Sequence, residues 1–185
     1  MDLTGRCRRK LNFYREVEVM SYRIVSDKPP LQIEEVAPGS GSFCGSSFIN
    51  RIFARYIEAK FQDSPQWDED YTYEALKCFE RDIKPRFSGH DKDHRKIKLR
   101  GLPDDEKLGI KDQWLEIPFS DLRDKIFEPV VSEVVDLVKS QLHKSTYRSN
   151  IMVLLAGGFG QNAYLRERLQ ETVGSLIQVL VIANG

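Results

Sequence analysis

The residues of this chain best suited to binding chemistry lie in two glycine-rich segments. One runs from Gly39 to Gly45, and the other reads Gly157-Gly158-Phe159-Gly160. Each follows an expected strand and precedes an expected helix. The backbone there can approach a ligand closely, and the free N–H groups of the helix start suit a phosphate or a ring edge. A tight turn that packs closely and binds nothing is the alternative interpretation of each segment taken alone.

Two standard nucleotide motifs can be tested on the second segment. Gly158-x-Gly160-x-x-Ala163 has the spacing of a dinucleotide fingerprint, but that motif requires a carboxylate roughly twenty residues later. The corresponding run, 177–182, contains no carboxylate. Neither glycine segment is followed by the Lys-Ser or Lys-Thr pair of a phosphate-binding P-loop. Both classes of site are therefore disfavoured.

A third candidate is the run from His90 to His94, which contains two histidines and two carboxylates. Histidines four residues apart are compatible with a metal ion. The run follows Ser88-Gly89 and stands among lysines, which favours a solvated turn. No metal site is predicted.

The hydrophobic pattern places regular elements around the glycine segments. Extended runs at 17–25 and 31–36, joined by a proline-containing turn, predict a hairpin. A helix is expected from about 46, a second over about 67–87 and a long one from about 120 to 138. The apolar stripe of the first helix consists of Phe48, Ile49, Ile52, Phe53, Tyr56 and Ile57.

The C-terminal part has the most regular pattern. An apolar strand at 151–155, a helix at 161–171 and a second apolar strand at 177–182 predict a parallel βαβ unit. We expect a core subdomain formed by 21–62 and 113–185. The remaining parts are an inserted helix-plus-strand subdomain, 63–112, and a divergent or non-native N-terminal segment, 1–20.

Composition narrows the class of protein. Hydrophobic residues make up 41% and charged residues 30% of the 185, as in soluble globular domains. Lys and Arg (28) balance Asp and Glu (28), which gives no reason to expect nucleic acid or a membrane as a partner. No apolar run is long enough to span a bilayer, and the start lacks the apolar stretch of a secretory signal. The scattered cysteines Cys7, Cys44 and Cys78 favour a reducing, cytoplasmic location.

Several stretches, in order along the chain, resemble the second lobe of the ATPase domain of seventy-kilodalton heat-shock chaperones. The run 38–51 is similar to the family's glycine loop with its following Phe-x-Asn-Arg. The run 153–161 looks like the family's adenosine motif, a buried strand that ends in Gly-Gly. The run 159–165 resembles divergent fungal and animal members, and 119–130 is similar to the family's long helix. The resemblance covers the chain from roughly Ser21 onward.

The resemblance implies an α/β fold of the actin-like, ribonuclease H-like type, with a mixed sheet flanked by helices and a small α+β insert. It implies ATP or ADP as the ligand, with Mg²⁺ only in a complete two-lobe protein. By position, the adenine and ribose site would be lined by Gly157, Gly158, Phe159, Gly160 and Gln161.

Three further residues are carried over by position. Gly45 would lie near the phosphates, while Glu80 and Lys84 would reach the ribose and base from the other side. Residues four apart on a helix share a face, so this carboxylate and ammonium can hold hydroxyls together. A solvated surface ion pair is the alternative.

The chain also departs from the family pattern. Phe159 replaces a small polar residue of the common chaperones, and 13–20 lacks the glycine cluster of the family's phosphate hairpin, Asp-x-Gly-Gly-Gly-Thr. The first lobe, which supplies metal-holding carboxylates, is absent from this sequence. We therefore expect an incomplete nucleotide-binding half, weakly active or inactive by itself, with a first lobe or co-chaperone-like proteins as partners. A non-enzymatic interaction module and a dinucleotide-using enzyme remain as alternatives.

Overall fold

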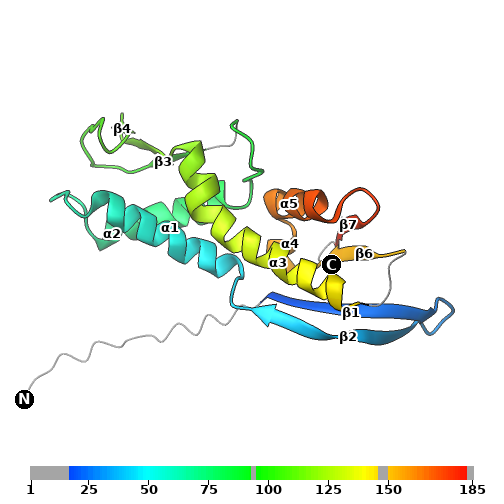
Figure 1. Cartoon of the computed structure of the whole chain (residues 1–185). Coiled ribbons are helices and arrows are strands. Elements are labelled where there is room, and N and C mark those ends of the chain that lie inside the picture. The colour runs from blue at the N-terminus through cyan, green and yellow to red at the C-terminus, as the bar shows by residue number, and fades with distance from the viewer. Residues whose placement is uncertain (1–16, 93–94, 146–149, 183–185) are drawn as a thin grey trace, which may run out of the picture.

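A computed structural model describes residues 17–92, 95–145 and 150–182, and it begins with a β-hairpin. Strands β1 (Val17–Ser26) and β2 (Gln32–Ser42) pair in antiparallel fashion, which confirms the predicted hairpin (Figure 1). Val17 and Val19 pack against the hydrophobic core. Burial alternates along β1 from Val17 to Tyr22, so α3 covers one face of the hairpin there, whereas 23–25 near the tip are exposed on both faces.

Helix α1 (Ser46–Phe61) follows, and its apolar stripe is the centre of the core. Ile49, Phe53, Ile57 and Phe61 recur every fourth residue, and each is at most 1% exposed. This spacing places them on one helix face, as the sequence predicts. The ring of Phe53 stacks on that of Phe79, with 4.0 Å between the ring centroids.

The second helix has two parts, α2 (Glu69–Cys78) and the π-helical turn η1 (Phe79–Ile83). Asp68 caps α2 by accepting a hydrogen bond from the backbone N–H of Tyr71. In η1 the N–H of Lys84 donates to the carbonyl of Phe79, five residues earlier, at 2.8 Å. The helix ends before Pro85, which has no backbone N–H to continue the helical hydrogen bonds.

A small antiparallel sheet packs beside α2. It consists of β3 (Lys96–Lys98), β4 (Ile110–Lys111) and β5 (Trp114–Glu116), in the order β3-β5-β4. Ile97 and Leu115 face each other across β3 and β5, and both are buried. The segment 114–116, grouped by the sequence with the core, is therefore bonded on both sides to strands of the insert.

The long helix also has two parts, η2 (Asp121–Phe127) and α3 (Glu128–Lys144). The helix switches from π-helical to α-helical hydrogen bonding near Pro129, because proline has no N–H to donate to the preceding turn. The N–H of Glu128 donates instead to the carbonyl of Arg123, five residues earlier. The helix continues through this position, as predicted. Its buried face is made of Val130, Val131, Val134, Val135, Val138 and Gln141.

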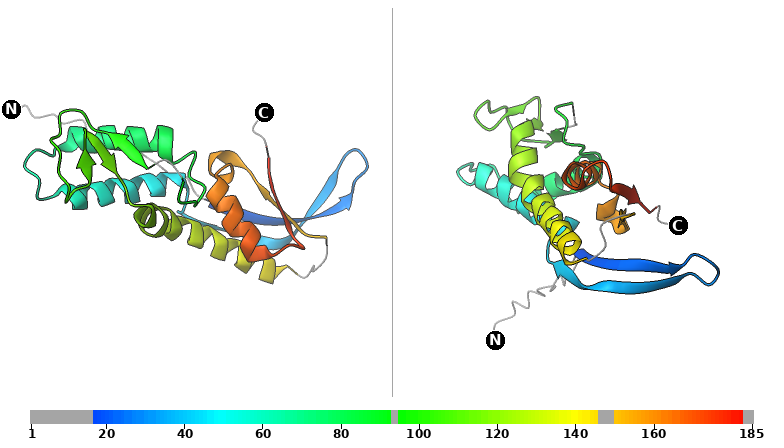
Figure 2. Two further views of the ribbon diagram at one scale, coloured as in Figure 1. Left: turned by 90° about the horizontal axis from the view of Figure 1, so that it is seen from above. Right: turned by 45° about the vertical axis from the view of Figure 1, so that its right-hand side comes forward.

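The last unit is β6 (Met152–Leu155), α4 (Gly157–Gly160), α5 (Ala163–Val173) and β7 (Gln178–Val181). Strands β6 and β7 are parallel, which confirms the predicted βαβ unit. Helix α3 packs on the hairpin, and α5 packs on β7 and on α3 (Figure 2). No helix of the described part combines the length and apolarity that a membrane span requires.

The structure is therefore α/β, but its described strands form three small sheets and not the mixed sheet that the resemblance implies. Among the described residues, β1-β2 and β6-β7 are separate two-stranded sheets. Strand β1 bonds to β2 and β6 bonds to β7, and no described strand pairs with both β1 and β6. The outer edges of both sheets therefore form no backbone pairing with another described strand.

Candidate functional site

A polar cluster joins helix α1 to the turn η1. The Nζ of Lys84 donates to the Oδ1 of Asn50 at 2.7 Å and lies 3.7 Å from the Oε1 of Glu80. The Nδ2 of Asn50 donates to that same Glu80 oxygen. We call Asn50, Glu80 and Lys84 the Asn50 cluster. It gathers one amide, one carboxylate and one ammonium, and it unites the two residues that the sequence placed on one helix face.

The side chain of Lys84 is only 19% exposed, whereas that of Glu80 is 46% exposed. The ammonium thus points inward to the amide, and the carboxylate stands at the edge of solvent. A π-helical turn carries Glu80, and such turns within helices are frequent at functional sites. Sequence reasoning missed Asn50. Its signal was its place as the asparagine of the Phe-x-Asn-Arg motif at 48–51.

Asn162 connects the glycine turn α4 to this cluster. Its Nδ2 donates to the carbonyl of Lys84 at 3.2 Å and to that of Phe87 at 3.5 Å. Its Oδ1 accepts from the N–H of Leu165 at 3.0 Å, so the same side chain caps α5. Asn162 is only 7% exposed. It follows Gln161 directly, and its position as an N-cap asparagine was the available sequence signal.

The glycines of the turn differ in what surrounds them. A Cβ built on Gly157 or on Gly158 would meet no atom within 4 Å, and Gly157 has a φ of +81°. A Cβ on Gly160 would lie 3.1 Å from the backbone carbon of Leu155. The first two glycines therefore face open space that a ligand can enter. The packing interpretation of the turn applies to Gly160.

Phe159 and Gln161 point to different environments. Phe159 is half-buried and packs against the hydrophobic core, whereas Gln161 is exposed. The amide side chain of Gln161 is thus the more accessible group beside the two open glycines. Phe159 anchors the turn to the protein interior.

Gly45 begins helix α1, the helix that carries Asn50. It is the N-cap residue with extended backbone, and its carbonyl accepts from the N–H of Phe48 at 2.9 Å. No side chain caps this helix end, and the first turn contains no acidic residue. The hydroxyl of Ser47 is buried and finds no hydrogen-bond partner among the described residues. Free N–H groups and an unsatisfied hydroxyl are features that favour an anion.

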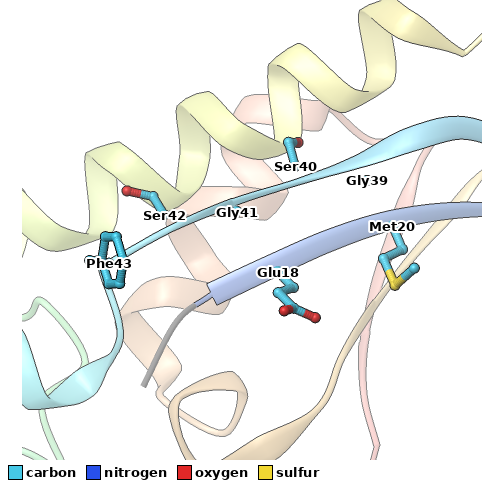
Figure 3. Close-up of a pocket in the computed structure, with 7 residues that line it drawn as sticks. All are labelled: Glu18, Met20, Gly39, Ser40, Gly41, Ser42 and Phe43. Carbon is cyan, nitrogen blue, oxygen red and sulfur yellow. The ribbon is translucent and has the colours of Figure 1, made fainter. Parts of the chain in front are cut away.

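A hollow of about 520 Å³ lies elsewhere, on the hairpin. Its lining is formed by Glu18, Met20, Gly39, Ser40, Gly41, Ser42 and Phe43 (Figure 3). Ser40 and Ser42 turn toward α3, where their hydroxyls donate to Gln141 and Glu133. Glu18 and Met20 point to the other side of the hairpin. None of the residues predicted for the nucleotide site lines this hollow.

Cys44, the buried cysteine within the first glycine segment, is poorly suited to act as a nucleophile. Burial, and secondarily the negative charge of Glu133, raises the pKa of Cys44 to about 11. A thiol with this pKa stays protonated at neutral pH. The metal-ligand candidates Asp93 and His94 lie outside the described residues. Within the residues that are described, no three His, Cys, Asp or Glu side chains gather in a way that suits a metal ion.

Helix α3 and helix α5 are tied together by a partly buried group of polar side chains. Arg168 donates from Nη2 to Glu128 Oε1 at 2.7 Å, and the hydroxyl of Tyr164 donates to Glu128 Oε2 at 2.5 Å. Burial and the hydrogen bond to Glu128 both raise the pKa of Tyr164. These contacts fix the helix that follows the glycine turn, so the turn sits on a rigid support.

Comparison of the chain with protein-family models, with curated proteins and with solved structures finds no match.

Proposed function

We propose that this chain is the adenine-nucleotide-binding half of an actin-fold ATPase of the heat-shock-chaperone type, weakly active or inactive by itself. One observation carries the proposal: Asn162 holds the glycine turn against the helix end that carries Lys84. Through this contact the turn that contains Gly157 and Gly158 is linked to the helix end whose Lys84 side chain belongs to the Asn50 cluster. The resemblance of the sequence motifs points to the same ligand.

The chemistry of the region suits the parts of an adenine nucleotide. The amide of Asn50, the carboxylate of Glu80 and the ammonium of Lys84 offer donors and acceptors for ribose hydroxyls and ring nitrogens. Because Gly157 and Gly158 have no Cβ, their backbone can approach a flat base closely. The uncapped start of α1 at Gly45, with the Ser47 hydroxyl, suits phosphate oxygens.

The donor set does not by itself suit a divalent cation. Mg²⁺ prefers an octahedral shell of oxygens, and the Asn50 cluster offers one carboxylate beside an ammonium. In this proposal Mg²⁺ accompanies ATP or ADP only in the complete two-lobe protein. A first lobe or a co-chaperone-like protein in the cytoplasm would supply the remaining groups.

A fluorescence titration with labelled ADP tests the proposal, with and without Mg²⁺. We expect Lys84→Met to weaken binding about tenfold, which corresponds to the loss of one charge-assisted contact worth roughly 1.4 kcal/mol. Lys77→Met is the matched control, because Lys77 lies on the same helical segment and pairs with Glu74 at 3.3 Å on the exposed surface. It should leave binding unchanged. Equal binding by both variants would contradict the proposed site, and a preference for NAD over ADP would favour the dinucleotide alternative.

A second candidate function is a non-enzymatic interaction module that keeps the fold without nucleotide. The observation that favours it is the apolar surface of both two-stranded sheets, where Met20, Ile24, Met152 and Leu154 are each about half exposed or more. Such surfaces on a folded domain mark sites of association. Absence of ADP binding at millimolar concentration, in a protein with intact secondary structure, would favour this function over the first.

A further inference from the structure

One face of the β1-β2 hairpin has no covering layer in the described part of the chain. We call it the bare hairpin face. Helix α3 packs on the hairpin through the opposite face, toward which Ser40 and Ser42 point (Figure 3). The bare hairpin face is made of Glu18, Met20, Tyr22 and Ile24 from β1 and of Ile33, Glu35, Gly39 and Gly41 from β2.

The apolar side chains of this face form a continuous patch. Tyr22 lies opposite Glu35, and Ile24 lies opposite Ile33, so the members of each pair point to the same side. Met20, Tyr22, Ile24 and Ile33 are between 49% and 60% exposed. A hairpin with one solvated face normally alternates apolar residues inward with polar residues outward. Here the outward residues of β1 are largely apolar, which indicates a surface that a partner covers.

The hollow at the base of this face has a specific shape and charge. Gly39 and Gly41 contribute no side chains, so the strand backbone forms its floor. Met20 and Phe43 stand at its sides, and the carboxylate of Glu18 stands at its edge (Figure 3). An aliphatic stem that ends in a cation fits this combination, since Lys and Arg bury their stems and keep the charge at a polar rim.

The charge of the bare hairpin face indicates the charge of the partner that it would bind. Its two charged residues are the carboxylates Glu18 and Glu35, and the residues that form it include no lysine or arginine. A complementary surface is therefore apolar with basic residues beside the apolar part. The architecture favours a helix as the partner element, because strands of α/β proteins bury their faces against helices and α3 already packs on the other side of the hairpin.

We propose that the bare hairpin face binds an amphipathic helix of a partner protein. The apolar stripe of that helix covers Met20, Tyr22 and Ile24, and one of its Lys or Arg side chains enters the hollow beside Glu18. This is recognition of a helix by an apolar groove with a charged anchor. The proposal does not depend on nucleotide binding, because none of its residues belongs to the nucleotide region.

The test uses two fluorescein-labelled helical peptides of roughly eighteen residues, long enough to show helical propensity. Both carry the same leucine stripe, flanked by Lys in one peptide and by Glu in the other. Fluorescence anisotropy on the full chain should show binding of the basic peptide about tenfold tighter than binding of the acidic one. Glu18→Lys should abolish or invert this preference, while Ile24→Ser should weaken binding of the basic peptide about tenfold.

Glu74→Lys is the matched control, because it makes the same charge change at an exposed position on α2. It should leave the peptide preference intact, and circular dichroism verifies the fold of each variant. Equal binding of the two peptides, or a preference that survives Glu18→Lys, would overturn the proposal. Sedimentation of the wild type as a dimer that Ile24→Ser converts to a monomer would also overturn it, since a second copy would then be the occupant.

Discussion

The side-chain amide of Asn162 lies 3.2 Å from the backbone carbonyl of Lys84 and donates a hydrogen bond to it. This bond joins residues 78 positions apart in the sequence and brings the turn after β6 to the end of η1. The same side chain caps α5 through the N–H of Leu165. One nearly buried amide therefore fixes both the direction of the helix and the position of the turn.

Asn162→Ala removes this amide, and we expect it to lower the free energy of unfolding by about 2 kcal/mol. About 1 kcal/mol of that is the lost N-cap, and the rest follows from buried carbonyls left without a donor. Urea denaturation followed by circular dichroism measures the change. Gln161→Ala, at the exposed neighbouring position, should stay within about 0.5 kcal/mol of the wild type. Similar values for the two variants would contradict the structural role of Asn162.

Glu128 should make stability depend on pH. Burial tends to raise the pKa of this carboxyl, but the hydrogen bonds from Arg168 and Tyr164 outweigh it and lower the pKa below its ordinary value of 4.5. A carboxyl with a depressed pKa in the folded state stabilises the protein above its unfolded-state pKa. That contribution disappears as the pH falls through the folded-state value.

Glu128→Gln should therefore destabilise the protein at neutral pH by about 1–3 kcal/mol, since it weakens a hydrogen-bonded ion pair. Below the ordinary pKa of a glutamate, 4.5, the difference in unfolding free energy between variant and wild type should become smaller. Denaturation midpoints across this pH range measure the effect. A gap that keeps its neutral-pH size in acid would show that the charge of Glu128 does not contribute.

The sequence predicted the elements of this protein better than their assembly. The stripe from Ile49 to Ile57 and the apolar strands of the βαβ unit follow from periodicity, which is a local property. The mixed sheet that the resemblance implies is not seen among the described strands, because β1 pairs with β2 and β6 with β7, and the choice of strand partner is not a local property of the sequence. Strand β5 shows the same limit in part, since its pairing with β4 is a local hairpin but its pairing with β3 joins strands separated by residues 99–113.

The candidate site was predicted in part for a similar reason. Helical spacing places Glu80 and Lys84 together, and their ion pair at 3.7 Å agrees with that geometry. The spacing carries no information on Asn50, which comes from another helix, or on the carbonyl contact of Asn162. In the sequence alone, Gly157, Gly158 and Gly160 cannot be told apart. Only the atoms around them distinguish the open Gly157 and Gly158 from the packed Gly160.

This difference between glycines predicts opposite tolerance to alanine. A Cβ on Gly160 would stand 3.1 Å from the backbone carbon of Leu155, so Gly160→Ala forces a shift of the chain and should cost about 1–3 kcal/mol. A Cβ on Gly158 meets nothing, so Gly158→Ala should remain within about 0.5 kcal/mol of the wild type. Thermal denaturation compares the two. The reverse order of stability would contradict the packing described for the turn.

Cys44 should resist thiol reagents in the folded protein. Its side chain is 1% exposed, and its pKa of about 11 leaves almost no thiolate at neutral pH. Reaction with a disulfide reagent, followed by mass spectrometry of the peptides, should label Cys44 only after denaturant is added. Cys78, which is partly exposed, is the internal comparison. Rapid labelling of Cys44 in the native protein would mean that the first glycine segment opens readily.

The nucleotide proposal is tested most directly by amide chemical shifts recorded during a titration with ADP. If the glycine turn and the Asn50 cluster hold the nucleotide, the largest shifts will fall on the backbone amides of Gly157, Gly158 and Lys84 and on the side-chain amide of Asn50. Gly158→Trp, which fills the open side of the turn, will abolish them. Shifts that gather on the hairpin, or an unchanged spectrum at millimolar ADP, would contradict the account.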